Sequence, residues 1–210
     1  MANLVGGMPV ADAAFYFDLA SSLAYLAAEQ ILHVLEGPVE WQPVLARELP
    51  GGGDESFDRT AIERRARELG LQPLRWPAEY PFDSTLAMRT ATYAKSIGRA
   101  VPFAQAAFRQ AFAGGRSLAE PDNVLIAAAA CEMHPAAVLR GAELRSVHES
   151  LSTATAQAAR LGVSRVPAVR IGSTHPGGLT RVFLGEHALE QASESWAQTS
   201  RARVAGVENR

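Results

Sequence analysis

A short stretch after the first apolar segment carries the residue types that could bind an anion or activate a nucleophile. Residues 18–22, DLASS, join the aromatic segment 13–18 to a run with apolar residues at helical spacing. The first amides of a helix lack intrahelical acceptors and carry partial positive charge, so they stabilise a thiolate, carboxylate or phosphate. Ser21 or Ser22 could donate to such an anion, or could simply cap the helix. Because no GxSxG motif or triad spacing is present, a serine nucleophile is the weaker functional hypothesis.

A proline stands at the start of a later apolar segment. Pro167 follows Val166 in the strand-like stretch 166–172, VPAVRIG. Proline removes a hydrogen-bond donor, so it fits only an edge strand or a strand beginning, and X–Pro bonds adopt the cis form at low cost. A cis proline facing residues 18–22 would leave the backbone groups of Val166 available to an extended, peptide-like ligand. An ordinary trans proline at a strand entrance is the alternative.

The composition excludes several kinds of chemistry. The single cysteine, Cys131, cannot form an internal disulfide, a CxxC redox pair or a cysteine zinc site. The histidines show no paired metal spacing, so we expect no metal. Lys95 is the one lysine and has no visible activating partner, which argues against Schiff-base chemistry. A net charge of −2 gives no support to nucleic-acid binding.

The sequence also argues against a membrane protein. The longest apolar stretch, 124–131, is too short to cross a bilayer. Residues 1–14 have no basic region before their apolar residues, so a secretory signal is not expected. We therefore expect a cytoplasmic protein with no membrane partner.

The elements that must position these residues follow from hydrophobic spacing and from proline and glycine punctuation. The predicted elements are a strand at 13–18, a helix at 23–36, a strand at 39–45, helices without a convincing strand at 55–161, strands at 166–172 and 180–185 around a turn at 173–179, and a helix at 186–198. A β-α-β start and a β-β-α finish separated by helices predict an α/β fold with a helical insertion.

Four segments, in order, resemble one known family. They are FYFDLASSLAYLAAE (15–29), YPFDSTLAMR (80–89), GVSRVPAV (162–169) and FLGEHALEQA (183–192). Together they resemble 2-hydroxychromene-2-carboxylate isomerases and kappa-class glutathione transferases, which are DsbA-like thioredoxin-fold proteins with a helical insertion. The resemblance implies a thioredoxin-like domain at 12–54 and 162–202, with the insertion at 55–161.

The resemblance also implies which residues bind a thiol. It makes Ser21 the catalytic serine, whose hydroxyl would donate to the sulfur of glutathione or another low-molecular-weight thiol. A free cysteine thiol, with a pKa of about 8.5, is mostly protonated at neutral pH and needs such help. Val166 and Pro167 would bind the peptide backbone of that thiol, and Ser22 lies beside Ser21 in the same site.

The substrate side and the far end of the thiol follow from the remaining segments. The resemblance implies contacts to a small-molecule substrate from Asp83, Ser84 and Arg89. Glu186 and His187 stand at the end of the thiol site, where the family has a small polar residue and an aspartate that holds the amino group of glutathione.

Several residues depart from the family pattern. Ser22 replaces the usual proline, Arg165 replaces a glycine, and Asp83 replaces an asparagine. His187 removes the expected acidic partner. These changes spare the sulfur-activating position but alter the glutathione end, so the thiol could be a different one or absent.

The resemblance implies a thiol-dependent isomerase or transferase that acts on a small conjugated or aromatic carboxylate. The alternative is a redox-inactive DsbA-like protein that binds a peptide or small ligand in the same groove. Related enzymes are often dimers, so a homodimer is expected on the resemblance alone.

Overall fold

The computed structural model describes residues 4–5, 8–9, 13–35, 37–52, 58–172 and 180–207, and the predicted turn at 173–179 lies outside them. In chain order the elements are β1 (Leu4–Val5), β2 (Met8–Pro9), β3 (Ala13–Phe17), α1 (Ser22–Val34), β4 (Val39–Pro43), the 3-10 turn η1 (Ala46–Glu48), α2 (Arg59–Glu68), α3 (Thr85–Ser96), α4 (Ala100–Phe112), α5 (Pro121–Ala129), α6 (Pro135–Ala142), α7 (Arg145–Arg160), β5 (Ala168–Gly172), β6 (Thr180–Leu184) and α8 (Ala188–Val207).

A four-stranded sheet in the order β4-β3-β5-β6 forms the centre of the molecule. β3 and β4 are parallel and joined by α1, whereas β5 runs antiparallel to both β3 and β6. Tyr16 near the end of β3 pairs with Ala168 at the start of β5. The predicted α/β class is confirmed, and this pairing brings the residues after β3 close to those before β5.

Both faces of β3 are buried. Phe15 and Phe17 belong to the main apolar core with α1 and α4, where the rings of Phe17 and Phe108 have centroids 5.9 Å apart. Tyr16 faces the other way and packs in a smaller cluster with Val163 and Val166. Burial on two faces explains why residues 13–17 form a continuous apolar run instead of an alternating one.

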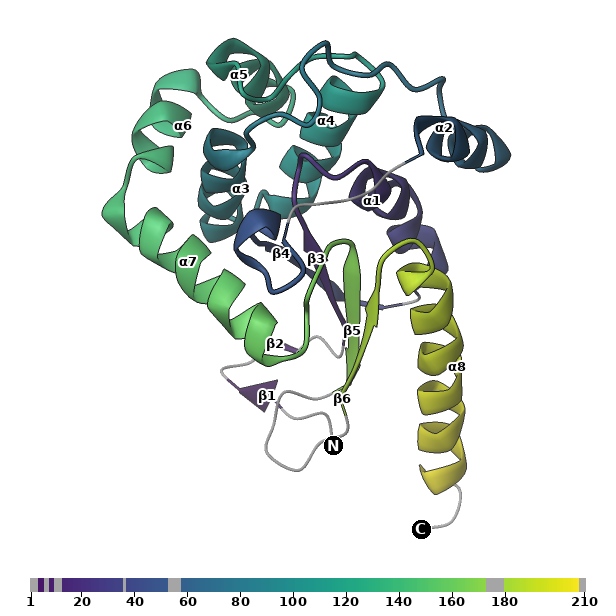
Figure 1. The fold of residues 1–210 in the computed structure, drawn as a ribbon. Coiled ribbons are helices and arrows are strands. Elements are labelled where there is room, and N and C mark those ends of the chain that lie inside the picture. The colour runs from purple at the N-terminus through teal and green to yellow at the C-terminus, as the bar shows by residue number, and fades with distance from the viewer. Residues whose placement is uncertain are drawn as a thin grey trace.

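The stretch predicted to be helical contains α2 to α7, and its described residues, 58–161, contain no strand. Pro121 and Pro135 begin α5 and α6, where the missing N–H of proline removes no helical hydrogen bond. Figure 1 shows α2 to α6 gathered beyond one end of the sheet, with α7 running back alongside it. None of the described helices is long and apolar enough to cross a membrane.

Candidate functional site

Ser21 occupies the N-cap of α1, in the turn that follows β3. Its φ and ψ are −89° and 116°, and its Oγ accepts a hydrogen bond from the backbone N–H of Ala24 at 3.1 Å. The Ser21 amide donates to the carbonyl oxygen of Asp18 at 3.0 Å, which closes the turn. A hydroxyl can accept and donate at the same time. Capping the helix and donating to an anion are therefore compatible roles for Ser21.

The buried carboxyl group of Asp18 connects three segments around this turn. Its Oδ1 accepts from the amide of Ala20 at 3.0 Å and its Oδ2 from the amide of Ala46 at 2.9 Å. The hydroxyl of Ser84 also hydrogen-bonds to it. Burial raises the pKa of Asp18, while these hydrogen bonds and the charge of Arg47 partly oppose the rise. Asp18 thus ties the β3–α1 turn to η1 and to the start of α3.

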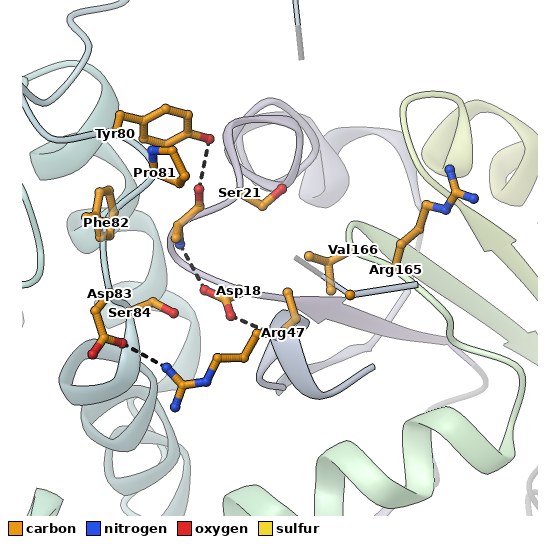
Figure 2. Close-up of a pocket in the computed structure, with 13 residues that line it drawn as sticks. Asp18, Ser21, Arg47, Tyr80, Pro81, Phe82, Asp83, Ser84, Arg165 and Val166 are labelled. Carbon is orange, nitrogen blue, oxygen red and sulfur yellow. Dashed lines mark hydrogen bonds and ion pairs between the residues drawn. The ribbon is translucent and has the colours of Figure 1, made fainter. Parts of the chain in front are cut away.

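Tyr80, from the segment before α3, clamps the same turn from the other side. Its hydroxyl donates to the carbonyl oxygen of Ala20 at 2.9 Å and accepts from the amide of Ser22 at 3.3 Å. The two bonded groups flank Ser21 in the chain, so the phenol brackets that residue (Figure 2). Tyr80 was not among the residues predicted for the site, although it lies in the YPFD segment that supported the resemblance.

Val166 faces Ser21 from the loop before β5. The Val166–Pro167 peptide bond is cis, and the carbonyl oxygen of Pro167 accepts from the Gly185 amide at 2.8 Å. Within the described part of the chain, the backbone N–H and C=O of Val166 have no hydrogen-bond partner. Figure 2 shows the Val166 side chain directed toward Ser21. An extended ligand in front of Val166 would therefore find an unused donor and acceptor.

A cavity of about 470 Å³ separates these two residues. We call it the Ser21 cavity; its lining residues are Asp18, Ala20, Ser21, Ala46, Arg47, Gly52, Tyr80, Pro81, Phe82, Asp83, Ser84, Arg165 and Val166. Its volume is in the range of small-molecule and cofactor sites. The residues from 80 to 82 supply an apolar wall, and the polar groups lie around Ser21 and Ser84.

Two arginines lie on opposite sides of the Ser21 cavity. Nη1 of Arg47 lies 3.0 Å from Oδ1 of Asp83 and also donates to Oγ1 of Thr85 at 2.9 Å. The hydrogen bonds from Thr85, and secondarily the charge of Arg47, lower the pKa of Asp83. Arg165 extends on the other side of Val166 (Figure 2). One arginine is therefore neutralised by an acid, while the other has no ion-pair partner in the described part of the chain.

Of the residues predicted for the site, five are close together. Ser21, Asp83, Ser84 and Val166 all line the cavity, and Pro167 follows Val166 directly. Ser22 is adjacent but fully buried, and its Oγ has no hydrogen-bond partner among the described residues. Ser22 faces the core because it is the first residue of α1 and turns away from the cavity that its neighbour lines.

The other three predicted residues lie outside the cavity lining. Arg89 is one turn further along α3 and lies 3.6 Å from a carboxylate oxygen of Glu143. His187 is exposed, with Nδ1 3.0 Å from Oε2 of Glu190. Glu186 lines a separate, much smaller depression beside α1 and α8. Both Glu186 and His187 lie in the turn between β6 and α8 and are exposed, and neither lines the Ser21 cavity.

Neither thiol nor metal chemistry of the chain itself is centred at this cavity. Cys131, directly after α5, is buried, and burial raises the pKa of its thiol. It does not line the Ser21 cavity. Among the described residues, no group of three or more His, Cys, Asp or Glu side chains gathers to hold a metal ion.

Comparison with known proteins identifies the fold. The model of the DSBA-like thioredoxin domain family matches residues 14–195. The chain belongs to this family. No curated protein sequence matches it. The family and thioredoxin fold predicted from the four segments are thus confirmed.

Solved structures show how widely this DSBA-like fold is shared. A 2-hydroxychromene-2-carboxylate isomerase matches with a TM-score of 0.75 and 17% identity, covering 92% of this chain and 98% of that one. The cytosolic disulfide reductase DsbM from Pseudomonas aeruginosa matches with a TM-score of 0.63 and 14% identity, over 92% and 98% of the two chains. The oxidoreductase DsbA from Xylella fastidiosa matches with a TM-score of 0.56 and 13% identity, covering 91% of this chain and 86% of that one. At these identities the likeness concerns the fold.

The residues present fit one part of a peptide-like thiol. Ser21 offers a hydroxyl at a helix N-terminus for the sulfur, and Val166 offers unpaired backbone groups for a peptide unit. The part of the site expected to hold the amino end of the thiol differs from the prediction. Glu186 and His187 lie outside the cavity, and Arg165 lines it. The Ser21 cavity of this DSBA-like protein thus offers polar groups for a sulfur and a peptide unit, and Arg165 lines it where the family pattern has a glycine.

Proposed function

We propose that this DSBA-like protein is a thiol-dependent isomerase or transferase that acts on a small conjugated or aromatic carboxylate. The thiol is glutathione or another low-molecular-weight thiol. The observation that carries the proposal is that the Ser21 hydroxyl, at the N-terminus of α1, faces the unpaired backbone of Val166 across one cavity.

Each of these residues has a distinct task. When bound, the thiol supplies the nucleophilic sulfur. Ser21 donates its O–H to that sulfur, and the partial positive charge of the α1 N-terminus also favours the ionised form. Val166 orients the ligand through its backbone N–H and C=O, as in the addition of a strand to a sheet edge. The chain thus contributes orientation and electrostatic stabilisation.

The substrate side of the cavity suits a flat apolar body with a polar group. Tyr80 and Phe82 pack with ring centroids 6.1 Å apart and, with Pro81, form the apolar wall. Ser84 lies on the same side and is held by its hydrogen bond to Asp18. We therefore assign Ser84 to the substrate side and leave Arg89 out of it, because Arg89 does not line the cavity.

The presence of one cysteine supports a second candidate function. With Cys131 away from the cavity, the chain has no dithiol with which to exchange disulfides. A non-catalytic protein that binds an extended peptide along Val166 would use the same unpaired backbone groups. The two functions differ in whether the Ser21 hydroxyl matters for turnover.

An isomerisation assay separates them. The conversion of cis-benzylidenepyruvate, an unsaturated aromatic keto acid, to its trans form can be followed by ultraviolet absorbance with and without glutathione. We expect turnover that requires the thiol and that falls about a hundredfold in Ser21→Ala, the effect of removing one well-placed donor. Ser152→Ala, on the exposed face of α7, is the matched control. No turnover with any thiol would favour the peptide-binding alternative. Turnover without thiol dependence, or equal rates in the two variants, would contradict the proposed role of the thiol and of Ser21.

A further inference from the structure

Two acids and two arginines line the Ser21 cavity, but among the described residues one of the arginines has no ion-pair partner. The carboxyl group of Asp18 is buried and accepts hydrogen bonds from the amides of Ala20 and Ala46. Asp83 lies 3.0 Å from Arg47 and offsets its charge on one side. Arg165, on the other side, is exposed and makes no ion pair with any described residue. The nearby acid Glu186 does not line the cavity, and His187 pairs with Glu190. A cation that lines a binding cavity without a partner favours an anionic group on the ligand.

The loop that carries Arg165 is held in place by its neighbours. The amide of Gly51 donates to the carbonyl oxygen of Ser164 at 2.8 Å. On the other side of Arg165, the buried Val166 packs in the cluster that contains Tyr16. The backbone of Arg165 is therefore fixed beside the unpaired groups of Val166, while its long side chain is exposed and able to turn toward a ligand.

We infer that the ligand bound along Val166 carries a carboxylate at the end that extends past this residue, and that Arg165 is the specificity-determining residue that binds it. The inference rests on the proposed function, since it takes the sulfur of that ligand to lie at Ser21. It assigns the class of thiol: one whose far end is acidic, with no ammonium group facing Arg165.

Four small ligands separate the two parts of this assignment. N-acetylcysteine and its primary amide differ only in the carboxylate, as do N-acetylalanine and its primary amide. Each cysteine compound differs from its alanine counterpart only in the thiol. Titrations of the full chain followed by NMR, under reducing conditions, give the four dissociation constants. The ratio of the dissociation constants of an acid and its amide tests the contact with Arg165. The ratio for a cysteine compound and its alanine counterpart tests the contact between the thiol and Ser21.

We expect both acids to bind about three- to fivefold more tightly than their amides, the upper part of the range for an ion pair at an exposed site. Arg165→Gln should remove this preference in both pairs, and Arg165→Lys should restore most of it. Arg160→Gln, on the exposed face of α7, should leave it intact. Circular dichroism establishes that each variant is folded.

Contradictory results have separate meanings. Acids and amides that bind equally, or a preference for acids that survives Arg165→Gln, would overturn the assignment of Arg165. A preference for acids without any gain from the thiol would uphold Arg165 and count against the proposed function instead. Rising salt should reduce the preference for acids, and a salt-independent preference would also contradict an ionic contact.

Discussion

The hydroxyl of Tyr80 accepts a hydrogen bond from the amide of Ser22 at 3.3 Å and donates to the carbonyl oxygen of Ala20 at 2.9 Å. One side chain of the helical insertion therefore holds the backbone on both sides of Ser21. The geometry of the candidate catalytic residue depends on the insertion as well as on the sheet.

Replacing Tyr80 with Phe removes both hydrogen bonds and keeps the ring. We expect the free energy of unfolding to fall by about 1–2 kcal/mol, because one backbone amide and one carbonyl lose their partner. Thiol binding should weaken as well, since the Ser21 turn is less well held. Urea unfolding and a glutathione titration measure the two effects. Tyr93→Phe, in α3, is the control. Equal losses of stability and of thiol binding in Tyr80→Phe and Tyr93→Phe would contradict the role of Tyr80.

Asp18→Asn tests the buried carboxyl group. Both carboxyl oxygens of Asp18 accept backbone N–H groups, and an amide side chain can accept only one of them. We expect a loss of about 1–3 kcal/mol in the free energy of unfolding, the cost of an unsatisfied buried donor. The hydrogen bond from the Ser84 hydroxyl to Asp18 should also weaken, because a neutral amide replaces the carboxyl group.

The size of that loss should depend on pH. Burial raises the pKa of folded Asp18 above the ordinary value of 3.8. The folded state then binds the proton more tightly, so the carboxyl contributes most stability below pH 3.8 and loses this contribution as pH rises through the folded pKa. The deficit of Asp18→Asn should therefore shrink as pH rises. Urea unfolding at several pH values above 4 measures it, and a deficit that grows with pH would contradict the raised pKa.

Gly51→Ala tests the close approach of two loops beside the cavity. A Cβ at this position would lie 2.5 Å from the carbonyl oxygen of Ser164, a backbone atom that cannot rotate away. We expect the segment around Val166 to shift, with lower stability and weaker ligand binding. Gly70→Ala has a strained φ of +67° but open space around it, far along the chain in a different loop. Gly70→Ala should lower the free energy of unfolding without weakening ligand binding. If Gly51→Ala and Gly70→Ala weakened binding equally, a local effect at Ser164 would be ruled out.

Local chemistry explains which parts of the site were predictable from sequence. Helix capping at Ser21 and the strand entrance at Pro167 involve neighbouring residues, and their signals lie within a few positions. The continuous apolar run at 13–17 similarly reflects a strand that is buried on both faces. These local signals predicted the strands and the helical stretch between them, whereas the facing of the two segments was implied by the family resemblance.

The remaining parts of the site depend on contacts between distant segments. The bonds from Tyr80 to Ala20 and from Asp18 to Ala46 form only when the insertion and η1 pack against the β3–α1 turn. The direction of His187 depends on the turn between β6 and α8, which residue types alone do not determine. Arg89 has the expected residue type at the expected spacing, but one further turn of α3 carries it outside the cavity.

The central property of the proposed site is that Ser21 stabilises a thiolate. The pKa of the glutathione thiol in the complex can be measured from its ultraviolet absorbance as a function of pH, in the native chain and in Ser21→Ala. We expect a bound thiol with a pKa below the unperturbed value of about 8.5, and a rise of this pKa toward that value in Ser21→Ala. A bound thiol whose pKa equals that of free glutathione, or one that Ser21→Ala leaves unchanged, would contradict this role of Ser21.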